Sequence, residues 1–262
     1  MKYALIDAKI YTPKTGELER QNMILANGQW VGAGYVPDDE DCTVIDLKNC
    51  IIVPNVVDFS PEVPIIGSPD ESSLSHGEML AQLSRDLQLL AINGGHLHVF
   101  PVSSAAALDL IRDAKAKGLP VTCGTSASHL LYCDEDHPLR GVADRQALRE
   151  AVQDGTLDVV ASNPQPSSPD DKRKDVVNAA LGRASVDHWV SDLLTVWVQE
   201  KWALGPLLAA ISTNPKRIFN LAFPKWGLLS APTFRAYKLA ATGCDCVLDV
   251  QNGIIRHQQH TS

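Results

Sequence analysis

The sequence predicts an α/β fold with parallel strands in the middle of the chain and β-structure at both ends. Two observations carry this prediction for the middle: residues 51–57 form an uninterrupted apolar run, and residues 78–161 alternate between helical spacing and short apolar strands. A third observation covers the ends, where short alternating segments are separated by turn residues.

The first 50 residues and the last 30 share the same strand-and-turn pattern. Asn27-Gly28 and Asn252-Gly253 are strong two-residue turn signals between such segments. The predicted strands are 3–6, 8–11, 22–26, 30–31, 43–46, 246–250 and 254–256. We therefore expect two domains: a small composite β-sandwich from residues 1–50 plus 231–262, and a β/α domain over residues 51–230.

The run at 51–57 is the first strand expected in the β/α domain. Ile and Val without polar alternation are typical of a strand buried on both faces, as in a parallel sheet covered by helices. In such sheets the functional site lies beyond the carboxyl ends of the strands. The residues just past this run, Asp58, Ser60 and Glu62, are therefore the first candidates for a site.

Helices and strands alternate after a loop rich in Pro, Gly and Ser at residues 60–75. The predicted order is helix 78–92, strand 96–100, helix 104–117, strand 120–123, helix 144–153 and strand 157–161. Gly94-Gly95 and Gly118 end the first two helices. Helix-to-strand alternation of this kind predicts β/α units with parallel strands.

Two further helices are predicted, at 186–203 and from residue 207 onward. The first has an apolar stripe that includes Leu193, Leu194, Trp197 and Trp202. A stripe at helical spacing is far more often core or subunit contact than a cofactor site, so we interpret it as packing.

Composition narrows the class of protein. The chain has 262 residues with 45% hydrophobic and 21% charged residues and a net charge of −8, as in ordinary globular proteins. The negative charge disfavours nucleic acid and anionic membranes as partners. Six cysteines without a C-x-x-C pair, and no window resembling a signal peptide or a membrane span, favour a cytoplasmic protein with reduced thiols.

The segment IIVPNVVDFSPEVP resembles the first barrel strand of the dihydroorotases and other amidohydrolases that act on cyclic amides. In that family the strand ends in D-x-H-x-H, and its two histidines hold a catalytic metal pair. Here the two histidine positions fall on Ser60 and Glu62. A serine hydroxyl is a poor zinc ligand, and one carboxylate does not replace two imidazoles.

Four later segments are similar to dihydroorotase motifs in the same order along the chain. They are LHVFPVSSAAALDLIRDAKAKGLPVT, CGTSASHLLYCDED, HPLR followed by ALREAVQDGTLDVVASNPQPSSPDDK, and STNPKRIFNL. By this resemblance a metal histidine falls on Pro101, another histidine on Ser128, and the catalytic aspartate on Asn163, while Arg140 is retained. An Asn side chain does not act as a general base.

The resemblance also implies a shortened barrel. Residues 51–230 are about 180 residues, whereas a full eight-unit barrel takes about 250. The family has several β/α units where this chain has the loop at 60–75. We therefore expect an incomplete half-barrel of the TIM type, with strand edges that a second copy, a partner chain or a local rearrangement would cover.

Seven residues are candidates for a remnant pocket that binds an acidic metabolite: Asp58, Ser60, Glu62, His98, His129, Arg140 and Asn163. His96 and His98 point to the same face of their strand, so a mononuclear metal site with His129 is an alternative. Two histidines without an identified carboxylate partner are more often structural residues.

Three functions remain open on this evidence. The resemblance first implies a non-catalytic dihydroorotase-like protein without metal, cofactor or catalytic residues. Inactive homologues in this family accompany bacterial aspartate carbamoyltransferase. The resemblance therefore implies that this chain binds an aspartate carbamoyltransferase catalytic chain, associates with itself, or does both. The second is an active cyclic-amide hydrolase with an atypical metal site, and the third is a metabolite-binding module that regulates a pyrimidine enzyme.

Overall fold

The computed structural model describes residues 2–12, 15, 17–26, 29–34, 41–47, 50–54, 56–58, 76–133, 140–163, 189–220, 234–240, 243–251 and 254–257. The chain divides into two compact units. Unit 1 comprises Met1–Val56, Leu194–Leu208 and Phe219–Ser262, and unit 2 comprises Val57–Leu193 and Ala209–Ile218. In the described parts, no helix is both long and apolar enough to cross a membrane.

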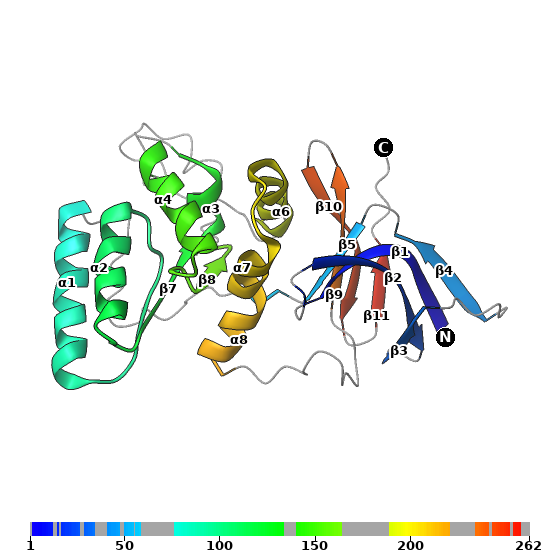
Figure 1. The fold of residues 1–262 in the computed structure, drawn as a ribbon, viewed down its shortest axis with the longest axis horizontal. Helices are drawn as coiled ribbons and strands as arrows, with labels where there is room; N and C mark the ends of the chain where they lie inside the picture. The colour runs from blue at the N-terminus through cyan, green and yellow to red at the C-terminus, as the bar shows by residue number, and fades with distance from the viewer. Residues whose placement is uncertain are drawn as a thin grey trace, which may run out of the picture. The chain divides into compact units, whose positions relative to one another are not determined.

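Unit 1 is built on one eight-stranded sheet to which both ends of the chain contribute. Its strands lie in the order β11-β10-β9-β5-β1-β2-β3, and β4 pairs with β1. The strands are β1 (Lys2–Thr12), β2 (Glu17–Ala26), β3 (Gln29–Ala33), β4 (Cys42–Asp46), β5 (Cys50–Pro54), β9 (Phe234–Ala240), β10 (Gly243–Gln251) and β11 (Ile254–His257). Figure 1 shows the blue and orange-red strands within this one unit. The predicted sandwich stays a prediction.

The sequence pattern predicts two short strands, but the structure has one long strand, β1. A bulge between Leu5 and Ala8, in the pairing of β1 with β2, interrupts the alternation and accounts for the difference. Asp7 has a φ of 58° at this point. Its backbone N–H donates to Asn22 Oδ1 at 3.1 Å, and its carboxylate pairs with Arg20 at 3.1 Å. The bulge shifts the alternation, so Leu5, Ala8 and Ile10 all enter the buried cluster of the sheet.

β5 corrects one expectation about the run at 51–57. We expected a barrel strand, but Cys50–Pro54 lies inside the sheet of unit 1, parallel to β1 and antiparallel to β9. Ile51, Ile52 and Val53 are fully buried there. A central strand of a mixed sheet needs the same apolar run as a parallel barrel strand, so the sequence does not distinguish the two. Of this run, only its last residue, Val57, belongs to unit 2.

Unit 2 contains a three-stranded parallel sheet in the order β6-β7-β8, as the β/α alternation predicts. Its strands are β6 (Leu97–Val99), β7 (Val121–Ser126) and β8 (Val159–Ala161). The helices are α1 (His76–Asn93), α2 (Ala105–Ala116), α3 (Ala127–Leu131) and α4 (Val142–Gln153). The predicted helices at 78–92, 104–117 and 144–153 are thus confirmed within a few residues.

α2 illustrates why these helices begin and end where they do. Ser104 caps it, accepting a hydrogen bond from Ala107 N at 3.3 Å, and Gly118 with a φ of 75° follows its end. Asp144 from the first turn of α4 also accepts from Ala105 N at 2.8 Å. Leu108, Ile111 and Ala114 supply the buried face. The first turns of α2 and α4 are therefore held together.

The segment after residue 188 forms a chain of short helices. It comprises α6 (Trp189–Glu200), α7 (Leu204–Leu208), the π-helix η1 (Ala209–Thr213) and α8 (Asn214–Ile218). Leu193 and Leu194 are fully buried, as expected for a packing stripe. Trp197 Nε1 donates to the carbonyl oxygen of Trp202 at 2.7 Å, which closes the turn after α6.

Candidate functional site

The carboxyl ends of β6, β7 and β8 meet at one edge of the parallel sheet, and the segments that follow them carry most of the described candidates. Val99 leads into residues 100–104, Ser126 begins α3, and Ala161 leads into Ser162 and Asn163. Polar side chains at this edge of a parallel sheet are in the position where ligands bind in α/β proteins. The candidate site is therefore this carboxyl edge, within unit 2.

Asp58 lies at the carboxyl edge, against the end of β8. Its Oδ1 accepts from Ser162 N at 2.8 Å, and its Oδ2 accepts from Ser162 Oγ at 2.6 Å. The segment before it is fixed by a hydrogen bond of 2.8 Å from Val57 N to the carbonyl of Ile211 in η1. Asn163 follows Ser162 directly and has a φ of 43°, so the backbone turns sharply after β8. Two predicted site residues, Asp58 and Asn163, are thus brought to one place.

His129 and Ser126 form the second part of the carboxyl edge. Ser126 Oγ lies 2.6 Å from His129 Nδ1 and accepts from His129 N at 3.4 Å, which is the local pattern of a helix N-cap. Both side chains are buried. Burial and, to a smaller extent, the charge of Arg140 lower the pKa of His129 to about 4. The imidazole is therefore neutral at neutral pH.

Arg140 stands just before α4 and reaches toward α1. Its Nη2 lies 3.4 Å from Met79 Sδ, and its Nε is buried. The positive charge of Arg140 contributes to the lowered pKa of His129. A cation beside a neutral, buried histidine is suited to holding an anionic group.

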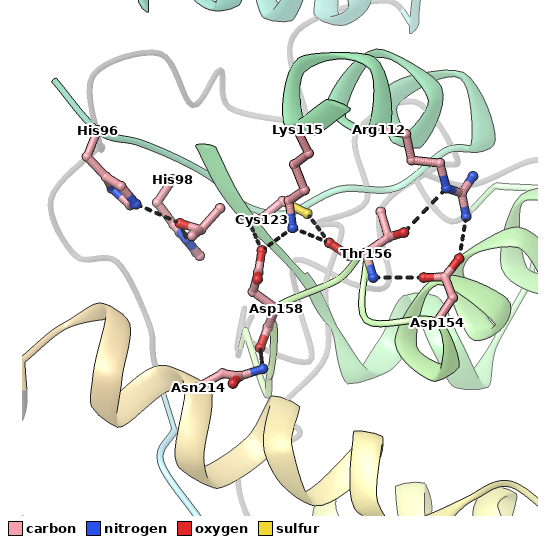
Figure 2. A network of polar contacts seen from close by, with 10 residues as sticks. His96, His98, Arg112, Lys115, Cys123, Asp154, Thr156, Asp158 and Asn214 are labelled. Carbon is pink, nitrogen blue, oxygen red and sulfur yellow. Dashed lines mark hydrogen bonds and ion pairs between the residues drawn. The ribbon is translucent and has the colours of Figure 1, made fainter. Parts of the chain in front are cut away.

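His98 lies elsewhere in unit 2. Its Nδ1 is 2.8 Å from Thr122 Oγ1, and His96 Nε2 is 3.4 Å from the same oxygen, as Figure 2 shows. The two histidines thus lie on the same face of their segment, as strand alternation predicts. Burial lowers the pKa of His98 to about 4, against the opposing charge of Asp158. His98 therefore belongs to a polar network at the amino ends of the strands, and the pocket that groups it with His129 stays a prediction.

This amino-end network was not predicted from the sequence. Asp158, which precedes β8, accepts from Lys115 Nζ at 2.7 Å and from Cys123 N at 2.9 Å. Asn214 donates to the Asp158 carbonyl at 3.0 Å, as Figure 2 shows. The network therefore connects α2, β7, the segment before β8 and α8.

The second half of the network centres on Thr156. Its carbonyl accepts from Lys115 Nζ at 2.7 Å and from Cys123 Sγ at 3.2 Å. Burial raises the pKa of Cys123 to about 12, so the thiol stays protonated and can donate. Arg112 contacts Thr156 Oγ1 at 3.4 Å and pairs with Asp154 at 3.1 Å. The only sequence signal for this arrangement is the turn D-G-T-L-D before β8. These contacts hold α2, β7 and the segment before β8 together.

The metal pair that the family resemblance implies does not fit the described residues. Nowhere in the described ranges do three or more His, Cys, Asp or Glu side chains come together as a possible metal site. Ser60 and Glu62, the candidates at the first two ligand positions, lie outside the described residues. No chemical step is therefore derived through a metal here.

Comparison with known proteins supports a relationship with dihydroorotases. The chain is 35% identical to the dihydroorotase of Lactiplantibacillus plantarum over 178 residues, which cover 63% of this chain and 41% of the relative. It is 31% identical to the dihydroorotase of Latilactobacillus sakei over 220 residues, covering 79% of this chain and 49% of the relative. The chain thus spans about half the length of these curated relatives or less. No family model matches it.

Solved structures show the fold. The dihydropyrimidinase of Brevibacillus agri aligns with a TM-score of 0.75 at 12% identity, covering 97% of this chain and 95% of that one. An inactive dihydroorotase-like domain of a CAD-like multifunctional protein from Chaetomium thermophilum aligns with a TM-score of 0.52 at 20% identity, covering 70% and 56%. The chain therefore has a mixed α/β fold of the amidohydrolase kind, while the half-barrel stays a prediction.

The expectation that this chain is not an enzyme is wrong. Several curated relatives at 31–35% identity are dihydroorotases, which points to a hydrolase. The expectation rested on ligand positions assigned from motif resemblance, namely Ser60, Glu62, Pro101 and Asn163. Of these, Ser60 and Glu62 lie outside the described residues, so a loss of catalytic groups is not established.

Proposed function

We propose that this chain is a hydrolase of small cyclic amides of the dihydroorotase kind, or a subunit that supplies a substantial part of such an enzyme. The observation that carries the proposal is the 35% identity to a dihydroorotase over 178 residues. The fold agrees with it, because solved neighbours are named dihydropyrimidinase and D-hydantoinase.

The carboxyl edge of unit 2 supplies groups suited to binding such a substrate. A cyclic amide presents carbonyl oxygens that accept hydrogen bonds and ring N–H groups that donate them. Arg140 offers guanidinium donors, Asn163 offers an amide with both functions, and Asp58 offers carboxylate oxygens. Of these, Asp58 is already fixed by Ser162, which holds its carboxylate in one orientation.

The proton balance of the reaction is simple. Water adds to the amide carbonyl and the C–N bond of the ring breaks. One proton of the water goes to the ring nitrogen, and the other is released to solvent as the new carboxyl group ionises to a carboxylate. With a pKa lowered to about 4, the imidazole of His129 stays neutral at pH 7, so it can donate or accept a hydrogen bond but does not readily take up a proton. In this proposal Arg140 and His129 bind and orient, and the group that activates water is not assigned.

The predicted association of this chain remains part of the proposal. The outer face of α1 exposes Ile92 at 78% and Leu89 at 47%, and apolar side chains at such exposure are consistent with a contact surface. We propose that the chain works as a self-associated oligomer or together with an aspartate carbamoyltransferase catalytic chain. Light scattering of the purified protein, and its co-purification with that chain from the native cell, test the two arrangements separately.

The decisive experiment is an assay in both directions. Dihydroorotate consumption and ring closure of carbamoyl aspartate are followed with the full chain, each with and without added zinc. We expect turnover that His129→Gln lowers by at least tenfold, while the surface variant Arg85→Met leaves it unchanged. A folded protein with no turnover in either direction under any of these conditions would refute the proposed function.

A further inference from the structure

α1 exposes two large apolar side chains, and no other helix or strand with described side chains exposes two. Leu89 is 47% exposed, and Ile92, at 78%, is the most exposed large hydrophobic side chain among those described. The two lie three positions apart, so they are neighbours on the helix surface. Leu83, Leu87 and Leu90 form the opposite, buried face. α1 therefore has a second apolar face, and that face is in solvent.

α1 is the outermost of the described helices of unit 2. Figure 1 shows it at the end of their row, with α2 beside it. α2 in turn packs against α4 and β7, so it lies between α1 and the rest of the unit. Because Leu89 and Ile92 are exposed, no described element of the chain covers them. The apolar face of α1 is therefore accessible to another molecule.

The sequence around this face lacks charged residues. Residues 87–108 run from the middle of α1 through β6 into α2 and include no Asp, Glu, Lys or Arg, in a chain where 21% of residues are charged. The charged side chains just before this stretch, Arg85 and Asp86, pair with each other at 2.8 Å. The whole chain has a net charge of −8, so two copies repel each other least where they meet at a surface without charge.

A second copy of this chain is the partner that such a face fits. In a two-fold contact both copies present the same surface, so any charge on it is brought near its own like charge. An apolar face without charge avoids this repulsion. Contact with a different protein would give no reason for the lack of charge, because opposite charges on the two partners would favour the complex.

We propose that two copies of this chain associate through α1, with Leu89 and Ile92 of one copy packed against the same face of the other. The inference rests on the proposed association of the chain and commits it to one partner and one surface. It is independent of the reaction. The contact removes from water the two side chains that unit 2 leaves uncovered.

The test is sedimentation equilibrium of the full chain and of two double variants in α1. One carries Leu89→Glu with Ile92→Glu, and the other carries Leu89→Lys with Ile92→Lys. Glu and Lys are good helix formers and both positions are exposed, so α1 stays folded, which thermal unfolding verifies. The control carries Val142→Glu with Val198→Glu, which adds the same charge at exposed apolar positions of α4 and α6.

We expect the wild type and the control to dimerise, and each α1 variant to raise the dissociation constant of the dimer at least tenfold, because like charges then face each other. An equimolar mixture of the Glu and Lys variants should dimerise again, since only identical contact surfaces place the new acids against the new bases. This mixture distinguishes a two-fold contact from one in which α1 docks on a different part of the second copy.

Three results would overturn the inference: a wild type that is monomeric at about 100 μM, where even a weak contact associates; an unchanged dissociation constant in both α1 variants; or no recovery in the mixture. A monomeric wild type that binds an aspartate carbamoyltransferase catalytic chain, and loses that binding in both α1 variants, would assign the face to that partner instead.

The outcomes separate this inference from the proposed reaction. Turnover by a wild type that stays monomeric would leave the hydrolase and refute the dimer. A dimer that depends on Leu89 and Ile92, without turnover in either direction, would leave the dimer and refute the hydrolase.

Discussion

Asp58 accepts two hydrogen bonds from Ser162, a residue 104 positions further along the chain. The pair fixes the segment that enters unit 2 against the end of β8, and it uses both carboxylate oxygens. A bond between a buried hydroxyl and a carboxylate is stronger than one between neutral groups. Together with the hydrogen bond from Val57 N to the Ile211 carbonyl, this contact holds the Val57–Asp58 segment at the carboxyl edge.

Removing the Asp58–Ser162 contact should destabilise the protein. We expect Ser162→Ala to lower the free energy of unfolding by about 1–3 kcal/mol, since the buried hydroxyl donates to a charged acceptor. Ser128→Ala, at a half-buried serine of α3, is the control and should change it by less than about 0.5 kcal/mol. Urea denaturation measures both. Additive effects of Asp58→Asn and Ser162→Ala in a double-mutant cycle would show that the pair is not coupled.

Substitutions in the amino-end network should lower the free energy of unfolding more than substitutions in surface ion pairs. Asp158→Ala leaves the N–H of Cys123 without its acceptor and Lys115 Nζ with only the Thr156 carbonyl and no carboxylate partner. For this partly buried site we expect a loss of about 3 kcal/mol in unfolding free energy. Asp109→Ala removes only an exposed pair with Arg112 and should cost less than about 1 kcal/mol. Similar losses for the two variants would contradict the buried role of Asp158.

Two histidines should make the protein less stable in acid. The folded-state pKa values of His98 and His129 are both about 4, below the ordinary 6.5. The unfolded chain therefore binds more protons between these values. The stability that each neutral histidine contributes is complete above pH 6.5 and is lost as pH falls through 4.

Each of these histidines should account for about 3 kcal/mol of that loss. Urea denaturation at pH 7, 5.5 and 4.5 measures the free energy of unfolding at each pH. In His129→Gln this free energy should fall less between pH 7 and pH 5.5 than it does in the wild type. Carboxylates titrate in the same acid range in every variant, so the comparison isolates the histidine. An unchanged slope in both His98→Gln and His129→Gln would rule out this origin.

Gly124 is required by the close approach of β7 and β8. A Cβ added there would lie 2.9 Å from the carbonyl oxygen of Val159 and 3.0 Å from Phe100 Cδ2. We expect Gly124→Ala to destabilise the protein by about 1–3 kcal/mol. Gly77→Ala, where a Cβ meets nothing within 4 Å, should be neutral or slightly stabilising. Thermal unfolding of the two variants side by side checks the difference.

Local structure was predictable where the sequence carries its own start and stop signals. Ser104 and Gly118 delimit α2, and the observed helix lies within one residue of the prediction at each end. The strand β9, in contrast, was missed, because its seven residues FRAYKLA show no regular alternation of apolar and polar side chains. The run before Val57 was predicted as a strand but placed in the wrong sheet, since burial on both faces does not specify a partner.

The sequence predicted only part of the candidate site. Asp58 was a candidate because it follows an apolar strand-like run, and Asn163 because of the family resemblance; in the structure Asp58 contacts Ser162, the neighbour of Asn163. The proximity of Arg140 to His129 and the network around Asp158 depend on packing between helices and strands. Lys115 and Asp158 are 43 residues apart, and no local pattern connects them. The placement of His98 with Thr122 also follows from strand pairing, which spacing alone does not define.

The strand order of unit 1 has a consequence for biosynthesis. β5 leaves the ribosome early, but β9, which pairs with it along its whole length, is made only after the whole of unit 2. Until then, one edge of the nascent sheet presents unpaired N–H and carbonyl groups of a fully apolar strand. Such an edge is a template for pairing with another chain. We expect ribosome-stalled chains that stop short of residue 234 to bind chaperones and to aggregate on release, while chains that include β9–β11 remain dispersed.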